Sequence, residues 1–385
     1  MTRSNGWIRA FETASARLFL ALARTWPGKA APASPPPDDR PVLIMKACCM
    51  GDAILSLYAI REFKRLHPAL DLEMLVSSRI SEVYLRAPEI ARVHVLPVTG
   101  RRLWLELLDP RFWARLGSVL LRLRRRHFGQ FVDLELYRAH GAIVKRVLGI
   151  PYSRGFRVEG APPKGHDMEV DRPRRMPEWQ CFYRIFGLDL PVALPTPLYP
   201  AAAPDSRRTD RGVRNPQRVR RIGVVFGSSF NWPQKKWPWE YFADTINLLA
   251  APEFEFILLG SPFEREDARM ILARAKGKVT DTTGTLDYAG LLREVAACDL
   301  LVGNDTGTLH LASACGVPTF TLFGPTDPDK WNGLTSTALY LDSVPCRPCY
   351  YLGSMPSCDH FSCLRKMQPA MVAGRIRGFF HPAAA

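Results

Sequence analysis

The chain has 385 residues, which is enough for two domains of ordinary size, each with its own hydrophobic core. Its hydrophobic fraction of 47% fits a globular protein, and no apolar stretch is long enough to span a bilayer, so the sequence predicts no membrane-spanning helix. The formal net charge of +15 suggests an acidic partner such as phosphates, an anionic membrane surface or nucleic acid, although an ordinary enzyme with basic surfaces would carry the same charge.

Residues 1–26 have the pattern of an amphipathic helix, with apolar residues on one stripe and arginines interspersed. Such a helix can lie in a membrane interface or pack on the protein's own core. Residues 27–40 are rich in proline and predict a linker, which detaches the helix and favours the membrane. The apolar run Leu18–Ala23 lies between two arginines and makes no convincing signal peptide. We therefore expect a cytoplasmic protein that is peripheral on the inner face of the inner membrane if this helix binds lipid.

Residues 41–195 predict a first α/β domain. Short apolar runs alternate there with helical patterns, which is typical of parallel βαβ units. The expected strands are 42–45, 70–76, 93–98 and 131–136, and a helix is expected over 53–66.

The arginine-rich segment 101–127 interrupts this alternation. Apolar side chains recur at helical spacing between eight arginines. One interpretation is an amphipathic helix with a solvated basic face, and this is sufficient for any single arginine. The cluster as a whole favours the other interpretation, a docking surface for an anionic acceptor or a membrane.

A second alternation follows an expected linker at 196–220 and fills residues 221–345. The expected strands are 221–226, 254–259, 300–302 and 319–323, and the expected helices are 239–249, 262–275, 288–297 and 308–315. The sequence thus predicts an α/β protein with two Rossmann-like halves. In open α/β sheets ligands bind beyond the carboxyl ends of the strands, and two halves facing each other would form a cleft for a two-substrate reaction.

The segment 301–328, LVGNDTGTLHLASACGVPTFTLFGPTDP, contains a strand-to-helix turn with the composition of a phosphate site. Asp305 or Thr306 can cap the following helix, whose N-terminus offers backbone N–H groups and a positive dipole end. Gly307 lets an anion approach the backbone, and His310 lies on the first turn. Alone, this pattern is also that of an ordinary capped helix.

Three further blocks accompany it: VLIMKACCMGDA at 42–53, GSSFNWPQKKWPWEYF at 227–242 and LLGSPFE at 258–264. The four blocks in this order resemble the family 9 glycosyltransferases, the family of the ADP-heptose:lipopolysaccharide heptosyltransferases, over roughly residues 41–365. The resemblance implies a GT-B fold of two Rossmann-like domains facing across a cleft. It places the nucleotide sugar in the C-terminal domain and the acceptor in the N-terminal one. It also implies inversion at the anomeric carbon without a cofactor or divalent metal for catalysis.

The resemblance assigns roles to individual residues. Asp52 matches the family's general base, for which helix capping is the alternative. Lys235, with Lys236 as the adjacent alternative, matches the lysine that stabilises charge on the leaving pyrophosphate. The remaining donor-binding positions are Ser228, Ser229, Glu264 (as a ribose ligand), Asp305, Thr306, Gly307 and His310. The chain departs from the family pattern at Cys48–Cys49 and Ser56–Tyr58, which we expect to touch the acceptor side.

Four of the nine cysteines are clustered in the segment 346–385, which also contains an expected C-terminal helix. Cys346, Cys349, Cys358 and Cys363 have the spacing C-x2-C-x8-C-x4-C, with His360 as a possible substitute ligand. In the cytoplasm, clustered thiolates more often hold metal than disulfides, so we expect a structural zinc or iron ion here. Reduced, packed cysteines are the alternative.

The leading hypothesis is a glycosyltransferase that moves a sugar, heptose by resemblance, from a nucleotide donor to a hydroxyl of an anionic envelope glycolipid such as the lipopolysaccharide core. One alternative changes the acceptor to a protein or another glycan. Another is an inactive membrane-associated scaffold, against which the presence of both Asp52 and Lys235 argues. No motif supports a nucleic-acid partner.

Overall fold

The computed structural model describes residues 39–97, 108–135, 140–158, 163–192, 219–228, 232–350 and 357–381, with residues 195, 197–199 and 355. The chain divides into two compact units, one ending at Leu190 and the other beginning at Pro191. The helix expected over 1–26, most of both linkers, Ser229, and Arg101 and Arg102 of the arginine-rich segment lie outside the described residues.

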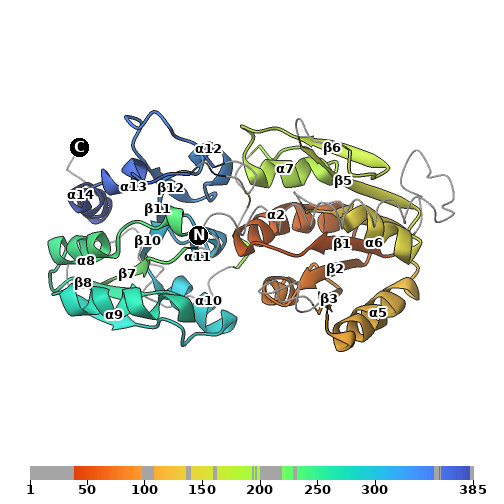
Figure 1. The fold of residues 1–385 in the computed structure, drawn as a ribbon, viewed down its shortest axis with the longest axis horizontal. Helices are drawn as coiled ribbons and strands as arrows, with labels where there is room; N and C mark the ends of the chain where they lie inside the picture. The colour runs from red at the N-terminus through yellow and green to blue at the C-terminus, as the bar shows by residue number, and fades with distance from the viewer. Residues whose placement is uncertain are drawn as a thin grey trace. The chain divides into compact units, whose positions relative to one another are not determined.

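The first unit is built on a six-stranded parallel sheet in the order β3-β2-β1-β4-β5-β6 (Figure 1). Its strands are β1 (Val42–Lys46), β2 (Leu72–Ser77), β3 (Arg92–Leu96), β4 (Gln130–Asp133), β5 (Tyr152–Val158) and β6 (Met168–Arg172). Its helices are α2 (Met50–Leu66), α3 (Ser81–Leu85), α5 (Pro110–Arg124), α6 (His140–Leu148) and α7 (Glu178–Ile185).

The second unit contains another six-stranded parallel sheet, in the order β12-β11-β10-β7-β8-β9 (Figure 1). Its strands are β7 (Arg220–Val225), β8 (Phe254–Leu258), β9 (Lys278–Asp281), β10 (Leu300–Asn304), β11 (Thr319–Leu322) and β12 (Ser336–Leu339). Its helical elements are η1 (Pro233–Lys235), α8 (Trp239–Leu248), η2 (Pro262–Glu264), α9 (Arg265–Arg274), α10 (Tyr288–Ala297), α11 (Gly307–Ala314), α12 (Pro328–Trp331), α13 (Ser362–Arg365) and α14 (Pro369–Phe380).

Burial on both faces explains why the central strands read as continuous apolar runs. All residues of β1, β4 and β10 are buried, as parallel strands covered by helices require. In the second unit, Trp237 and Met367 join the core between the sheet and α8, and the Trp237 indole N–H donates to the Met367 carbonyl at 2.9 Å. The two α/β halves predicted from the sequence are therefore confirmed.

Both sheets have the strand order of a doubly wound Rossmann fold, so each has a switch point where the order reverses. In the first unit this point lies between β1 and β4, which pair in parallel. In the second it lies between β7 and β10, which also pair in parallel. The carboxyl ends of β1, β7 and β10 carry three of the four blocks that the sequence singled out, and the fourth, LLGSPFE, follows β8.

Several predicted boundaries were wrong by a few residues. The strand expected over 131–136 ends at Asp133, because the Asp133 carboxylate accepts the Glu135 backbone N–H at 2.9 Å and turns the chain. The strand expected over 93–98 ends at Leu96, and that expected over 300–302 continues to Asn304. Within 140–190 the structure adds α6, β5, β6 and α7, for which no elements were predicted.

Among the described residues, no helix combines the length and apolarity needed to cross a membrane.

Close packing between β7 and β10 makes Gly303 a test of this sheet. A Cβ atom on Gly303 would lie 2.1 Å from the Val225 carbonyl oxygen, which belongs to the neighbouring backbone and has little freedom to move. We expect Gly303→Ala to destabilise the second unit by about 1–3 kcal/mol, the usual cost of overpacking.

Gly374→Ala is the matched control, because Gly374 lies in α14 with nothing within 4 Å of a Cβ atom. This change should stabilise by up to about 1 kcal/mol through helix propensity. Chemical denaturation followed by far-UV circular dichroism measures both variants. Equal stability of the two would contradict the packing described here.

Candidate functional site

At the switch point of the first unit, a buried lysine joins two carboxylates. Lys46, the last residue of β1, is fully buried. Its Nζ atom lies 3.5 Å from Asp52 Oδ2, in the first turn of α2, and 3.7 Å from Glu135 Oε1, just after β4. The side chains of Asp52 and Glu135 are only 12% and 10% exposed, so the three charges share a site largely removed from water.

Glu135 is held by several neighbours of the same edge. Its Oε1 accepts the Ala47 backbone N–H at 2.5 Å, and the Cys48 thiol donates to Oε2 at 3.5 Å. The Lys164 ammonium donates to the Glu135 backbone carbonyl at 2.7 Å. The carboxylate therefore ties the end of β1 to the end of β4.

Burial and the shared lysine shift the pKa values of these groups in different directions. Burial alone would lower the pKa of Lys46, but Cys48, Glu135 and Asp52 outweigh it and raise that pKa well above its ordinary value. Burial raises the pKa of Asp52, and Lys46 opposes this only partly. Burial also acts to raise the pKa of Glu135, but Lys46 and backbone N–H donors lower it overall. Asp52 is therefore the carboxylate with increased basicity, while Glu135 stays ionised.

At the switch point of the second unit, Asn304 organises the turn between β10 and α11. Its amide N–H group donates to the Phe226 carbonyl at 2.7 Å and to the Gly227 carbonyl at 3.1 Å. Its oxygen accepts the Trp237 backbone N–H at 2.9 Å. Asn304 thereby joins the end of β7 to the segment that carries Lys235.

Lys235 lies beside Asp305, with 3.0 Å between Nζ and Oδ2. Its ammonium is also 4.8 Å from the centre of the Tyr350 ring, a cation–π distance. The adjacent Lys236 is ion-paired with Asp267 of α9 instead. The structure therefore separates the two lysines that the sequence left as alternatives, and it places Lys235 at the switch point.

The N-terminus of α11 has no side-chain cap, although the sequence allowed one from Asp305 or Thr306. Thr306 is the N-cap residue, but it makes no capping hydrogen bond, and its buried hydroxyl has no partner among the described residues. His310 Nδ1 is likewise buried without a described partner. Burial lowers the pKa of His310, so its imidazole is neutral at pH 7.

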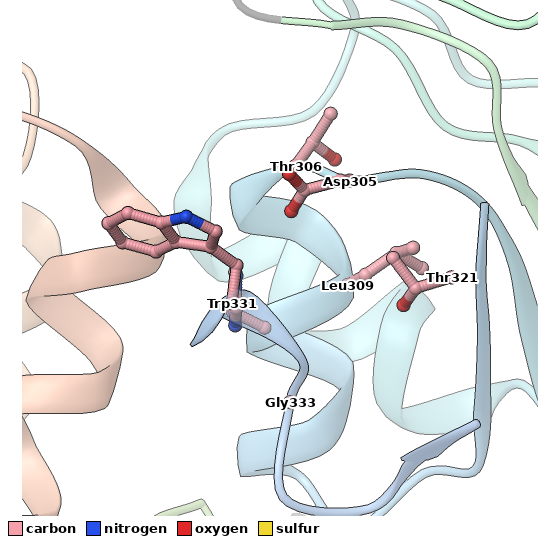
Figure 2. Close-up of a pocket in the computed structure, with 7 residues that line it drawn as sticks. Asp305, Thr306, Leu309, Thr321, Trp331 and Gly333 are labelled. Atoms are coloured by element: carbon pink, nitrogen blue, oxygen red, sulfur yellow. The ribbon is translucent and has the colours of Figure 1, made fainter. Parts of the chain in front are cut away.

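These groups line a narrow hollow at the surface. Its lining residues are Asp305, Thr306, Leu309, His310, Thr321, Trp331 and Gly333. Figure 2 shows Asp305 and Thr306 at the start of α11. Burial acts to raise the pKa of Asp305, but Lys235 and His310 lower it overall, so the carboxylate stays ionised and fixes Lys235 beside the hollow. The arrangement of a cation, a hydroxyl and an uncapped helix N-terminus suits an anionic ligand.

A comparison with known families identifies the chain. Residues 120–352, more than half of it, match the model of glycosyltransferase family 9 (heptosyltransferase). The chain belongs to this family. It is therefore a glycosyltransferase.

Two relatives found by sequence and one solved structure are similar to this chain over most of its length. Lipopolysaccharide heptosyltransferase 1 of Pseudomonas aeruginosa is 28% identical over 324 residues, which cover 80% of this chain and 85% of the relative. Lipopolysaccharide heptosyltransferase 2 of Escherichia coli K12 is 24% identical over 303 residues, covering 75% and 84%. The structure of E. coli ADP-heptose lps heptosyltransferase II aligns with a TM-score of 0.67 at 19% identity, covering 88% of this chain and 98% of that one. The predicted GT-B fold is confirmed.

Two expected donor-site residues of this family 9 enzyme have local structural partners. Glu264 forms a capping box with Ser261, whose backbone N–H it accepts at 2.7 Å, and its carboxylate lies against Gly227 at the end of β7. The Ser228 hydroxyl donates to the Trp232 carbonyl at 3.1 Å. Both residues lie at or near the switch point, and their roles toward the donor stay predictions.

The departures from the family pattern in α2 lie in a buried stretch of the helix, and their expected contact with the acceptor stays a prediction. Ser56, Leu57 and Tyr58 are buried, and the Ser56 hydroxyl donates to the Ala53 carbonyl at 2.8 Å. This part of α2 is buried on all sides, so these residues contribute to packing. Cys48 and Cys49 do lie at the switch point, and Cys49 has a φ of 65° as it leads into α2.

The expected structural metal site is not supported. Among the described residues no group of three or more His, Cys, Asp or Glu side chains could hold a metal ion. The four clustered cysteines are free thiols, and they lie near enough to one another to interact. Burial, followed by the neighbouring Cys349, raises the pKa of Cys363 to about 11, so this thiol is protonated at neutral pH.

Three residues of these two sites, Lys46, Glu135 and Asn304, were not predicted from the sequence. Lys46 and Asn304 lie within the quoted blocks, where a charged or amide side chain at the end of an apolar strand was the available signal. Glu135 was absorbed into an expected strand, so its position beyond the strand end could not be recognised.

The buried charges of the first unit predict a pH-dependent stability defect for Lys46→Met. Removing the lysine leaves Asp52 and Glu135 buried without their shared cation, which costs about 3–5 kcal/mol when one partner of a buried pair is lost. Without Lys46 the pKa of Asp52, which burial already raises, should rise further. Protonation of Asp52 then removes the unpaired buried charge and stabilises the folded state. The loss should therefore be larger at pH 8 than at pH 5, as measured by thermal unfolding at both pH values.

Lys276→Met, at an exposed position, is the control and should change the midpoint little at either pH. A Lys46→Met protein as stable as the control at pH 8 would show that the three charges are not coupled.

Proposed function

We propose that this family 9 enzyme is an inverting heptosyltransferase that transfers heptose from ADP-heptose to a hydroxyl of the lipopolysaccharide core. Its relatives of similar length are lipopolysaccharide heptosyltransferases, and the aligned structure is that of an ADP-heptose enzyme. The observation that carries the mechanism is the buried carboxylate of Asp52, whose pKa burial raises, at the switch point of the first unit.

Asp52 is proposed as the general base. In the transfer, the acceptor hydroxyl oxygen forms a bond to the anomeric carbon while the bond from that carbon to the diphosphate oxygen breaks. The hydroxyl proton passes to Asp52. A carboxylate of increased basicity accepts this proton more readily than a solvated one, and Lys46 acts against the rise in its pKa.

Lys235 and the N-terminus of α11 are proposed to stabilise the leaving nucleoside diphosphate. Negative charge grows on the diphosphate as the sugar leaves, and fixed cations or backbone N–H groups stabilise it without rearrangement. Asp305 and Tyr350 hold the Lys235 ammonium beside the helix start, and the Thr306 hydroxyl and neutral His310 supply polar atoms there. Gly307 opens α11, and Glu264, Ser228 and Ser229 are proposed to contribute to nucleotide binding.

The acceptor could differ from the lipopolysaccharide core. The pair Cys48–Cys49 departs from the family pattern and follows the carboxyl end of β1, on the unit proposed to bind the acceptor. A protein or another glycan is therefore the second candidate acceptor. An inactive scaffold is disfavoured by the intact buried charges at both switch points. Turnover with a panel of acceptors decides between the first two.

Replacing Asp52 tests the proposed base. We expect Asp52→Asn to lower kcat for ADP release from ADP-heptose by about 10²–10⁴-fold, the usual contribution of a general base. In the wild type kcat should rise as the pH rises through the raised pKa of Asp52, because only the carboxylate accepts a proton. The variant should lack this acidic limb.

Asp171→Asn is the control, since Asp171 is an exposed carboxylate of β6 paired with Arg157. Undiminished turnover in Asp52→Asn would rule out the mechanism. A preference for another sugar nucleotide would leave the family and the base intact and make the sugar wrong.

The two adjacent lysines give a matched pair for the donor site. Lys235→Met should lower kcat by about 10²–10³-fold, the usual effect of removing one group that stabilises charge in the transition state. Lys236→Met should retain near wild-type turnover, because Lys236 pairs with Asp267 of α9. Steady-state kinetics and ADP binding by calorimetry measure both, and equal losses in the two variants would refute the assignment to Lys235.

A further inference from the structure

The outer side of α5 presents arginines together with exposed apolar side chains. Arg111, Arg115, Arg122, Arg124 and Arg125 are all exposed, and Trp113 and Leu121 between them are 46% and 53% exposed. These seven residues are called the α5 basic face. Figure 1 shows α5 at the outside of the first unit, next to β3 and α6.

The inner side of α5 already supplies the contacts that a helix needs to pack. Phe112, Val119 and Leu123 are buried, and the last two join a core cluster with strand residues such as Phe131. Neither Trp113 nor Leu121 belongs to this core cluster, and about half of each side chain remains exposed. A helix whose outer side is only solvated would have polar residues at these positions.

The charges of this face are unbalanced. Neither α5 nor the adjacent α6 contains an aspartate or glutamate. Within the part of the chain that the structure describes, none of the five arginines forms an ion pair with a carboxylate, and Arg111 and Arg115 are one helical turn apart. By contrast, Arg269 of α9 is paired with Glu266 one turn away. Like charges at this spacing repel each other, so binding of an anionic partner would reduce this repulsion.

We propose that the α5 basic face docks the enzyme on an anionic phospholipid membrane. Arginines attract the phosphate headgroups, and half-exposed tryptophan and leucine side chains insert at the boundary between headgroups and acyl chains. Val147 of α6, 41% exposed, extends the apolar part, because Arg124 of α5 reaches the Val147 carbonyl at 3.3 Å. The inference does not depend on the proposed sugar or acceptor, since lipid binding needs no turnover.

Vesicle co-sedimentation of the full chain tests this docking. The probe is phosphatidylcholine vesicles with and without about one third phosphatidylglycerol, and the variant replaces Arg111, Arg115 and Arg122 by glutamine. Each arginine near an anionic surface strengthens partition by roughly five-fold, so the triple variant should bind anionic vesicles roughly 100-fold more weakly. Binding should fall with added salt, and Trp113→Ser should weaken it separately.

The matched control replaces Arg65, Arg269 and Arg375, exposed arginines of α2, α9 and α14, by glutamine for the same change in net charge. The proposal is supported if this control keeps wild-type binding. It is overturned if both triple variants lose binding equally, because net charge alone would then explain the binding. It is also overturned if neither variant loses binding. It is also overturned if the α5 variant loses binding to a DNA duplex but not to vesicles.

Turnover with a short, water-soluble acceptor separates this docking from catalysis. The α5 triple variant should retain it, because none of its three arginines belongs to either switch point. Absent turnover in the wild type would count against the proposed function and would leave the vesicle result as it stands.

Discussion

The charge of Lys46, buried at the end of the central strand of the first sheet, is the constraint around which that unit's site is arranged. An ammonium removed from water must have anionic partners close by, and Asp52 and Glu135 supply them from two different elements. The pairing ties the first turn of α2 and the end of β4 to β1. It also leaves Asp52 with a raised pKa and Glu135 with a lowered one.

The second unit, which has the same kind of strand order, also pairs a lysine with a carboxylate. Its lysine, Lys235, comes from a short helix after β7, and its carboxylate, Asp305, from the turn after β10. In each unit, then, a lysine and a carboxylate meet where the strand order reverses. The pairs differ in exposure: Lys46 is fully buried, whereas the Lys235 side chain is 15% exposed and lies next to an open hollow. This difference agrees with the roles proposed for them, Lys46 beside the proposed base and Lys235 beside the proposed ligand site.

The sequence was sufficient for the α/β class, for both Rossmann halves and for the placement of Asp305 and Lys235, because buried parallel strands and strand-to-helix turns have strong local patterns. It was not sufficient for Lys46 or Glu135, whose importance depends on which strands are neighbours across the sheet. Nor could it show that Ser56–Tyr58 are buried, since that burial depends on the packing of α2 against α7 and α3. The cysteine spacing suggested a metal site that the positions of the described side chains do not support.

The segment that follows β12 positions an aromatic ring beside Lys235. The Cys349 and Tyr350 backbone N–H groups both donate to the Pro325 carbonyl, at 3.0 and 2.9 Å. The Arg347 guanidinium donates to the neighbouring Gly324 carbonyl at 2.6 Å. These hydrogen bonds join the segment 347–350 to the Gly-Pro-Thr-Asp-Pro turn. They also place Tyr350 next to the ammonium of Lys235. A stretch of chain without any reacting group therefore determines where the aromatic ring beside that cation stands, and so how strongly the cation is held.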